Sequence, residues 1–249
     1  MATYSFVASH RIIDLTTVAL LSNGAAGIPE LFRTETAQNL GVTGTIVLAT
    51  CNRLEIYVQL SVAEHLGPVS DMLYAEIAQK SELDAELIAG SFEIYENLEA
   101  AKHLFTVASG LESAVVGERE IAGQMRRAAH TAWEDGTLSC DLGRAAERAS
   151  ATSRRVATET GLAGAGRSVV AVGLDMAAAH LRPWEGARVL IVGTGAYAGR
   201  PSAPCTRSAH RTWPSTRRPG AHANSPRGEA SAGLMPQACP LLWNAPTSW

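Results

Sequence analysis

The chain has 249 residues, 46% of them hydrophobic, so it is long enough to bury a sizeable core. Its net charge of −3 is unevenly spread, because residues 1–199 hold 15 Lys and Arg against 23 Asp and Glu, whereas residues 200–249 hold six Arg against one Glu. The chain has no apolar run of the roughly 18–20 residues that span a bilayer and no basic leader. Its four cysteines are widely spaced. These features argue against a membrane protein, a secreted disulfide framework and a metal site, so we expect a cytoplasmic protein.

The first hundred residues alternate between strand and helix patterns. Short β-branched and aromatic runs predict strands, and longer runs with helical spacing predict helices. In chain order the pattern predicts a strand at Tyr4–Ser9, a helix at Leu15–Leu21, strands at Thr45–Thr50 and Leu54–Leu60, helices at Glu64–Gln79 and Glu82–Ala89, and a strand at Phe92–Tyr95.

The next hundred residues are mainly helical. Leu98–Asp135 has helical periodicity interrupted by Gly110 and Gly117, and Leu142–Gly161 is rich in Ala, Arg, Glu and Thr, as expected of an exposed helix or connector. Ser168–Leu181 is again helical, and Ala187–Val192 is a compact apolar strand of the type found in parallel sheets. The alternation as a whole predicts an α+β domain followed by the start of an α/β unit.

Residues 200–249 have a different composition. They contain eight of the 11 prolines and no Val, Ile, Phe, Tyr, Lys or Asp. Such a composition cannot build a core, so we expect a disordered tail. The predicted organisation is a domain at 1–150, connector helices at 151–186, a strand with a glycine loop at 187–199, and the tail at 200–249.

Cys51 lies where a predicted strand gives way to a polar loop. A thiolate is a strong nucleophile, and a cation such as Arg53 close by would favour it. His103, from another segment, is a candidate acid or base. Considered alone, a cysteine after an apolar strand is more often a small core residue, and a helical histidine is more often packed or on the surface.

Two glycine-rich segments are further candidates. Around Gly110 and Gly117, glycines would let a substrate approach the backbone while Ser113, Glu118 and Gln124 reach its polar groups; the competing interpretation is close helix packing beside a solvated charged face. Gly193–Gly199 follows an apolar strand and fits the G-x-G-x-x-A variant of the dinucleotide fingerprint. The second strand that this fold needs is missing after it, although Arg217 and Arg218 lie at a suitable distance to read a 2′-phosphate.

Four segments together resemble the glutamyl-tRNA reductase family. Their order and spacing also fit, and the resemblance covers about residues 1–199. The segments are Thr-Cys-Asn-Arg-Leu-Glu-Ile-Tyr at 50–57, His-Leu-Phe-x-Val-Ala-Ser-Gly-Leu-Glu-Ser at 103–113, Gly-Glu-x-x-Ile-x-Gly-Gln at 117–124 and Arg-Val-Ala-Thr-Glu-Thr-Gly at 155–161.

The resemblance implies an activity. Members of this family reduce glutamyl-tRNA(Glu) with NADPH to glutamate-1-semialdehyde, the first committed intermediate of five-carbon tetrapyrrole (porphyrin and haem) synthesis. A cysteine takes the glutamyl group as a thioester while tRNA leaves, and hydride then releases the aldehyde. The implied fold is an α+β catalytic domain, then a Rossmann-type NADP-binding domain. Implied partners are glutamyl-tRNA(Glu), the next enzyme, glutamate-1-semialdehyde aminomutase, and a second copy of the chain, although nothing in this sequence resembles the family's helical dimerisation domain.

The resemblance also implies residue roles. Cys51 matches the nucleophile and His103 the histidine important for activity. Glu120 stands where the family commonly has Gln. The positions matching substrate contacts are Thr50, Cys51, Asn52, Arg53, Ser113, Glu118, Arg119, Glu120 and Gln124, and those matching the NADPH loop are Gly193, Thr194, Gly195, Ala196, Tyr197 and Ala198.

Residues 200–249 depart from the family altogether. An abrupt loss of Val, Ile and Lys is what a reading-frame change in GC-rich DNA produces, and we expect that this tail is out-of-frame translation of a truncated copy. Resequencing the coding DNA tests this expectation. With this tail, the chain is expected to form the thioester but to be impaired in hydride transfer.

Two other interpretations stay open. One is a non-catalytic remnant that binds tRNA or a pathway partner, although the formal charge of −8 over residues 1–199 provides no broad basic surface for nucleic acid. The other is a dinucleotide-binding oxidoreductase of unrelated activity, recognised only by Gly193–Gly199. Turnover of glutamyl-tRNA that is lost when Cys51 is alkylated would separate the enzyme from both.

Overall fold

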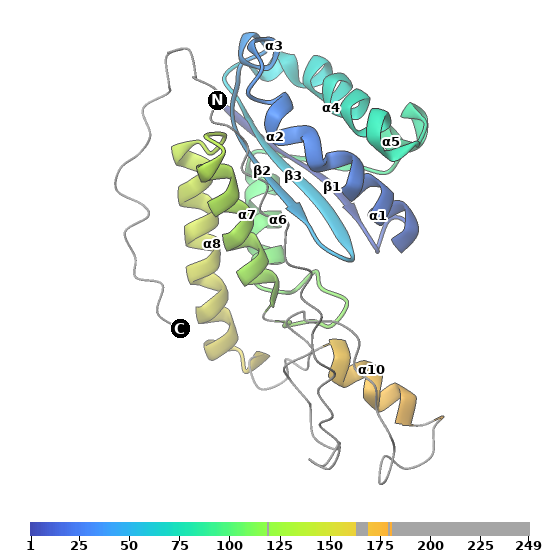
Figure 1. The fold of residues 1–249 in the computed structure, drawn as a ribbon. Helices are drawn as coiled ribbons and strands as arrows, with labels where there is room; N and C mark the ends of the chain where they lie inside the picture. Colours follow the sequence, from blue (N-terminus) through green and yellow to red (C-terminus); the bar gives the residue numbers. More distant parts are fainter. Residues whose placement is uncertain (119, 163–168, 179, 181–249) are drawn as a thin grey trace, which may run out of the picture. The chain divides into compact units, whose positions relative to one another are not determined.

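A four-stranded antiparallel sheet forms the centre of the fold (Figure 1). The structure is a computed structural model, and it describes residues 1–118, 120–162, 169–178 and 180. The strand order is β2-β3-β1-β4, and all neighbouring strands are antiparallel. The strands are β1 (Ala2–Ser9), β2 (Val42–Ala49), β3 (Arg53–Leu60) and β4 (Glu93–Glu96).

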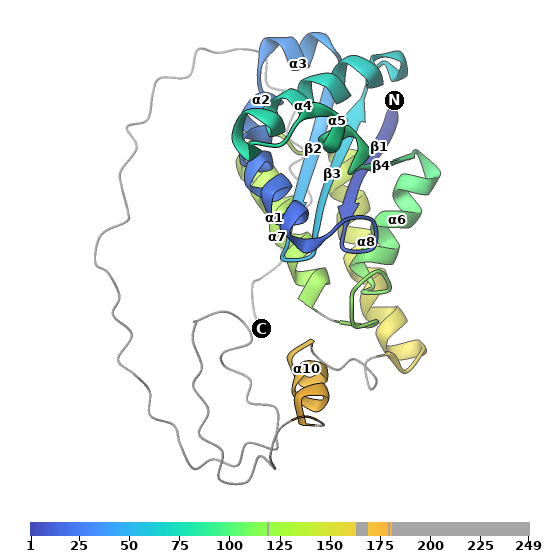
Figure 2. The same cartoon turned by 90° about the vertical axis from the view of Figure 1, so that its right-hand side faces the viewer.

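Helices from the first 90 residues cover one face of the sheet (Figure 2). Asp14 begins α1 by accepting hydrogen bonds from the backbone amides of Thr16 and Thr17, as an N-cap residue does. The core on this face includes Phe6, Ile56 and Leu73, all fully buried. The helical segments in order are α1 (Leu15–Gly24), η1 (Ala25–Gly27), α2 (Ile28–Leu31), α3 (Glu35–Asn39), η2 (Ala63–His65), α4 (Leu66–Ser81) and α5 (Ala85–Gly90).

Three helices cover the opposite face of the sheet (Figure 1). They are α6 (Leu98–Ala108), α7 (Glu120–Glu134) and α8 (Cys140–Glu159). Their core contains Ile46, Leu48 and Tyr57 from the sheet and Leu104 and Met125 from the helices. Because both faces are covered, every residue of β3 is buried. The α+β domain is therefore a sheet between two helical layers.

The predicted strands and helices of the first 135 residues are confirmed, with boundaries shifted by a few residues. The expectation of an exposed helix or connector over Leu142–Gly161 is wrong in part. The segment is helical, but Leu142, Ala146 and Ala149 of α8 are buried in the second core. Small side chains at this spacing form a contact face for a neighbouring helix. α8 also continues without a break across residue 150, where a domain boundary was predicted. That boundary stays a prediction.

Beyond this domain the structure describes one more helix, α10 (Val169–Ala178), which confirms the helix predicted at Ser168–Leu181. The predicted strand Ala187–Val192, the glycine loop and residues 200–249 lie outside the described residues. Within the described ranges, none of the helices has the length and apolar character needed to cross a bilayer. In the same ranges, no three His, Cys, Asp or Glu side chains gather as they would around a metal ion.

Candidate active site

Cys51 lies at the tip of the hairpin between β2 and β3. The backbone amide of Thr50 donates to the carbonyl of Arg53 at 2.9 Å, which closes the turn around Cys51 and Asn52. Inside the turn, the Thr50 hydroxyl donates to the Asn52 side-chain oxygen at 3.0 Å. The amide of His10 reaches the Asn52 carbonyl at 2.9 Å and ties the tip to the end of β1. The result is a rigid turn that leaves the Cys51 thiol exposed.

Three polar side chains of β3 are buried below this tip. Alternate residues of a strand share one face, so Arg53, Glu55 and Tyr57 all point toward the layer of α6, α7 and α8. The guanidinium of Arg53 lies 2.6 Å from Glu55 Oε1, and the hydroxyl of Tyr57 donates to Glu55 Oε2, also at 2.6 Å. All three are nearly inaccessible to solvent, with Glu55 0% exposed. A buried charge is stable only when it is paired in this way.

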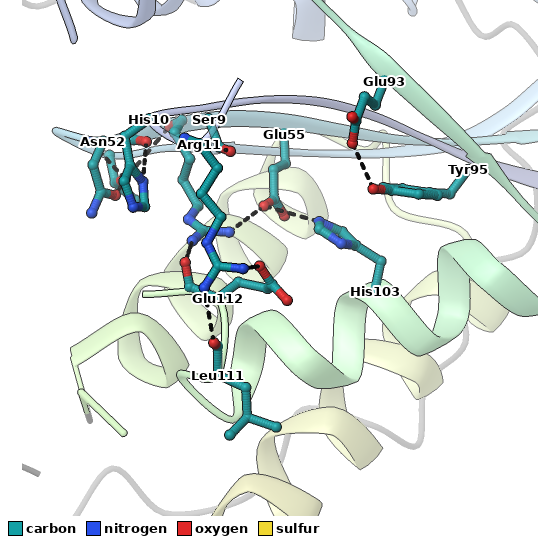
Figure 3. A network of polar contacts seen from close by, with 12 residues as sticks. Ser9, His10, Arg11, Asn52, Glu55, Glu93, Tyr95, His103, Leu111 and Glu112 are labelled. Carbon is teal, nitrogen blue, oxygen red and sulfur yellow. Dashed lines mark hydrogen bonds and ion pairs between the residues drawn. The ribbon is translucent and has the colours of Figure 1, made fainter. Parts of the chain in front are cut away.

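His103 completes this cluster from α6. Its Nε2 lies 3.1 Å from Glu55 Oε1, and its ring stacks on Tyr95 of β4 with the ring centroids 5.0 Å apart (Figure 3). The Tyr95 hydroxyl in turn donates to Glu93 at 2.7 Å. The start of α6 is attached to β1 because Asn97 exchanges two hydrogen bonds with the backbone of Thr3. Contacts with the sheet therefore fix both the position of α6 and the orientation of the His103 imidazole.

The loop between α6 and α7 closes over the same end of the sheet. Arg11 donates to the carbonyl of Leu111 and pairs with the Glu112 carboxylate (Figure 3). Arg53 donates to the backbone carbonyl of Glu112. Gly110 has a φ of 74°, and a Cβ there would lie 2.6 Å from the Glu118 carbonyl oxygen. In this structure the glycine thus allows the loop backbone at Gly110 to pack closely against the backbone at Glu118.

The electrostatics of the cluster favour an ionised Glu55. Burial raises the pKa of Glu55, but hydrogen bonding with His103, the charges of His103 and Arg53, and the Tyr57 hydroxyl together lower that pKa below its ordinary value. Burial and the neighbouring Glu55 carboxylate raise the pKa of Tyr57 well above its ordinary value. The hydrogen bond to Glu93, together with burial, raises the pKa of Tyr95 to about 12. Both phenols are therefore neutral donors at ordinary pH.

The predicted site residues fall into three groups. Thr50, Cys51, Asn52 and Arg53 form the hairpin tip, and Arg53 is joined to His103 through Glu55. Ser113 is buried in the loop, Glu118 ends the described part of that loop, and Glu120 and Gln124 lie in the first two turns of α7. Arg119 and the predicted NADPH-loop residues 193–198 lie outside the described residues.

The predicted role of Arg53 in favouring the Cys51 thiolate stays a prediction. The Arg53 guanidinium contacts the Glu55 carboxylate and the Glu112 carbonyl, and no hydrogen bond joins Cys51 to His103 in the described part of the chain. The Nε of Arg53 is buried without a hydrogen-bond partner among the described residues.

Sequence reasoning did not single out Glu55, Tyr57 or Tyr95 as site residues. The period-2 pattern of Arg53, Glu55, Tyr57 and Gln59 was the available signal, because four polar residues on one face of a buried strand need partners. That signal could not show that His103 and Tyr95, far away in the sequence, supply the partner and the stacking surface. The contact with Arg11 likewise depends on the tertiary fold.

The fold and this cluster define an α+β domain with an exposed cysteine above a buried Arg–Glu–His network. The family model described as "Glutamyl-tRNAGlu reductase, N-terminal domain" matches residues 7–160. The chain therefore belongs to the glutamyl-tRNA reductase family, as its motifs predict.

Similar proteins bear the same name. The glutamyl-tRNA reductase of Paenarthrobacter aurescens is 43% identical over 201 residues, and that of Kocuria rhizophila is 45% identical over 204 residues. Each alignment covers 80% of this chain and 45% of the relative, so the chain spans about half the length of these curated relatives. The solved glutamyl-tRNA reductase from Methanopyrus kandleri matches with 28% identity and a TM-score of 0.49, over 63% of this chain and 34% of that one.

Proposed function

We propose that this chain carries out the acyl-transfer half of the glutamyl-tRNA reductase reaction, with Cys51 as the nucleophile. The observation that carries the proposal is the place of Cys51, exposed at the tip of a rigid hairpin whose next strand begins with the buried Arg53–Glu55 pair. A nucleophile needs access to a substrate and a fixed backbone, and the hairpin gives Cys51 both.

The steps proposed for the described residues are those of acyl transfer. The Cys51 thiolate attacks the ester carbonyl of glutamyl-tRNA(Glu), a carbon–sulfur bond forms, and the ester carbon–oxygen bond breaks. The thiol proton is transferred to the leaving ribose oxygen through a general acid–base, the proposed role of His103. A thioester is a reactive acyl donor, which explains why the chemistry uses a cysteine.

Substrate contacts are proposed for the hairpin tip and the loop that faces it. Thr50, Asn52 and Arg53 come from the tip, and Ser113, Glu118, Arg119, Glu120 and Gln124 from the loop and α7. The buried Nε of Arg53, which lacks a partner among the described residues, supports a contact with a carbonyl or carboxylate oxygen of the glutamyl group.

NADPH remains a proposed cofactor, and it would supply the hydride that reduces the thioester to the aldehyde. The residues proposed to hold it, Gly193–Ala198, are outside the described residues. We further propose that this copy is impaired in reduction, because residues 200–249 hold no Val, Ile, Phe or Tyr from which further strands of the cofactor sheet could form. Glutamate-1-semialdehyde aminomutase and a second copy of the chain stay proposed partners.

Intact-mass spectrometry of the purified chain mixed with glutamyl-tRNA, without NADPH, tests this function. The expected result is one glutamyl adduct, mapped to Cys51 by peptide digestion. Cys51→Ala should abolish the adduct, whereas the matched control Cys140→Ser, at the partly buried first residue of α8, should keep it. A folded protein that binds glutamyl-tRNA without forming the adduct would instead be a non-catalytic remnant.

A further inference from the structure

The imidazole of His103 is held from two directions. Glu55 Oε1 lies 3.1 Å from Nε2, and Tyr95 stacks on the ring with an interplanar angle of 25° (Figure 3). The side chain of His103 is only 12% exposed. Within the described residues, Nδ1 has no hydrogen-bond partner. The ring therefore has one nitrogen committed to the protein and one that is not.

The hydrogen bonds around Glu55 decide which nitrogen carries the proton. Oε1 lies 2.6 Å from Arg53 Nη1 and 3.1 Å from His103 Nε2, and Oε2 receives the Tyr57 hydroxyl. An ionised carboxylate only accepts hydrogen bonds, and a guanidinium only donates them. The buried, ion-paired Glu55 is ionised, so Nε2 of His103 must be the donor. A neutral imidazole with a proton on Nε2 has its lone pair on Nδ1.

We propose that Glu55 is a positioning residue that fixes His103 in the Nε2–H tautomer, so that Nδ1 is the nitrogen that exchanges protons with the reactants. The catalytic part of this statement rests on the proposed function, while the tautomer does not. Nδ1 accepts the proton of the Cys51 thiol as the carbon–sulfur bond forms. It then donates that proton to the ribose oxygen as the ester bond breaks, so atoms and electrons balance without a further reactant.

The neighbouring groups support the assignment. Tyr95 contacts the ring through its face, and its hydroxyl is occupied by Glu93, so it fixes the ring plane without competing for a ring nitrogen. Arg53 pairs with the same carboxylate and keeps it charged. A base whose second nitrogen is oriented by a carboxylate is the arrangement that generalises the catalytic triad.

Long-range ¹H–¹⁵N NMR of the full chain, labelled with ¹⁵N-histidine, tests the tautomer directly. The His103 signals are assigned as those missing from a His103→Gln spectrum. At a pH where the ring is neutral, the expected pattern has a protonated Nε2 and an unprotonated Nδ1. A protonated Nδ1, or an equal mixture of the two forms, would overturn the inference.

Variants separate positioning from stability. Glu55→Gln should raise the fraction of the Nδ1–H form and slow glutamyl transfer to Cys51 by about 100-fold, the lower end of what a general acid–base contributes. Tyr57→Phe removes another hydrogen bond from the same carboxylate but keeps its charge, so it should leave the tautomer unchanged. If Glu55→Gln does not fold, the NMR pattern of the unmodified chain still decides the question.

The outcomes for the two proposals differ. The Nε2–H tautomer in a chain that forms no glutamyl adduct would refute the proposed function and leave the positioning by Glu55 intact. An adduct formed at Cys51 by a chain with the Nδ1–H tautomer would support the function and overturn the positioning role of Glu55.

Discussion

Gly110 offers a test of how the loop over the site is built. Its φ is 74°, and a Cβ at this position would lie 2.6 Å from the carbonyl oxygen and 3.1 Å from the amide nitrogen of Glu118. Gly136 has nearly the same φ, 71°, but a Cβ there meets nothing within 4 Å. An alanine at either position would adopt the same strained backbone conformation, but only an alanine at Gly110 would also clash with neighbouring atoms.

Gly136→Ala should therefore lower the free energy of unfolding by about 1–2 kcal/mol, the usual penalty for an L-residue in the left-handed region. Gly110→Ala adds a clash with backbone atoms, which cannot rotate away, and overpacking costs about 1–3 kcal/mol more. We expect a total loss of about 2–5 kcal/mol, together with a displaced Glu118 and slower glutamyl transfer to Cys51.

Urea denaturation of both variants, followed by circular dichroism, measures the difference in the free energy of unfolding. Gly136→Ala is the matched control, since it is exposed and far from the loop in sequence. Equal losses in the two variants, or a Gly110→Ala protein as stable as the unmodified chain, would refute the claim that the close approach of Gly110 to Glu118 shapes this loop.

Two further predictions concern the buried charges. Arg53→Met should lower the free energy of unfolding by about 3–5 kcal/mol, because it leaves Glu55 buried without its ion-pair partner. The double variant Arg53→Met/Glu55→Leu should recover most of that loss in the same urea assay. A double variant no more stable than the single one would contradict the reasoning. The pKa of Glu55 is lowered from its ordinary value of 4.5, so the ionised carboxylate stabilises the fold at pH values above 4.5, and this stabilisation is lost as the pH falls through the lower pKa of the folded state. Glu55→Gln lacks this carboxylate, so its free energy of unfolding should depend less on pH between neutral and acidic pH in urea titrations.

Much of the fold could be predicted from local patterns. Strands such as β2 and β3 show as β-branched and apolar runs, and the hairpin tip at Cys51 shows as the polar break between them. The buried face of α8 could not be recognised, because Ala146 and Ala149 are small residues whose burial depends on a neighbouring helix approaching closely. Composition alone made this helix look solvent-exposed.

The site was predictable only where it is local in sequence. Cys51 and Arg53 stand together in one motif, and His103 was a candidate acid or base that the family resemblance then supported. The carboxylate that joins Arg53 to His103 is part of the same motif, but its role depends on the register of β3 against β1 and on the docking of α6 onto the sheet. Such long-range contacts leave no periodic signal in the chain.

Because β3 is completely buried, we expect global unfolding of the domain and local opening of its loops to be distinct motions. The amides of β3 lie between two helical layers, so their hydrogen exchange should require opening of the whole domain. The loop from Ser109 to Glu118 has no strand partner, and its backbone hydrogen bonds are short-range turns supplemented by contacts from Arg11 and Arg53, so we expect it to exchange by local opening. The domain can therefore open the loop between α6 and α7 while the strand that carries Arg53 and Glu55 stays in register.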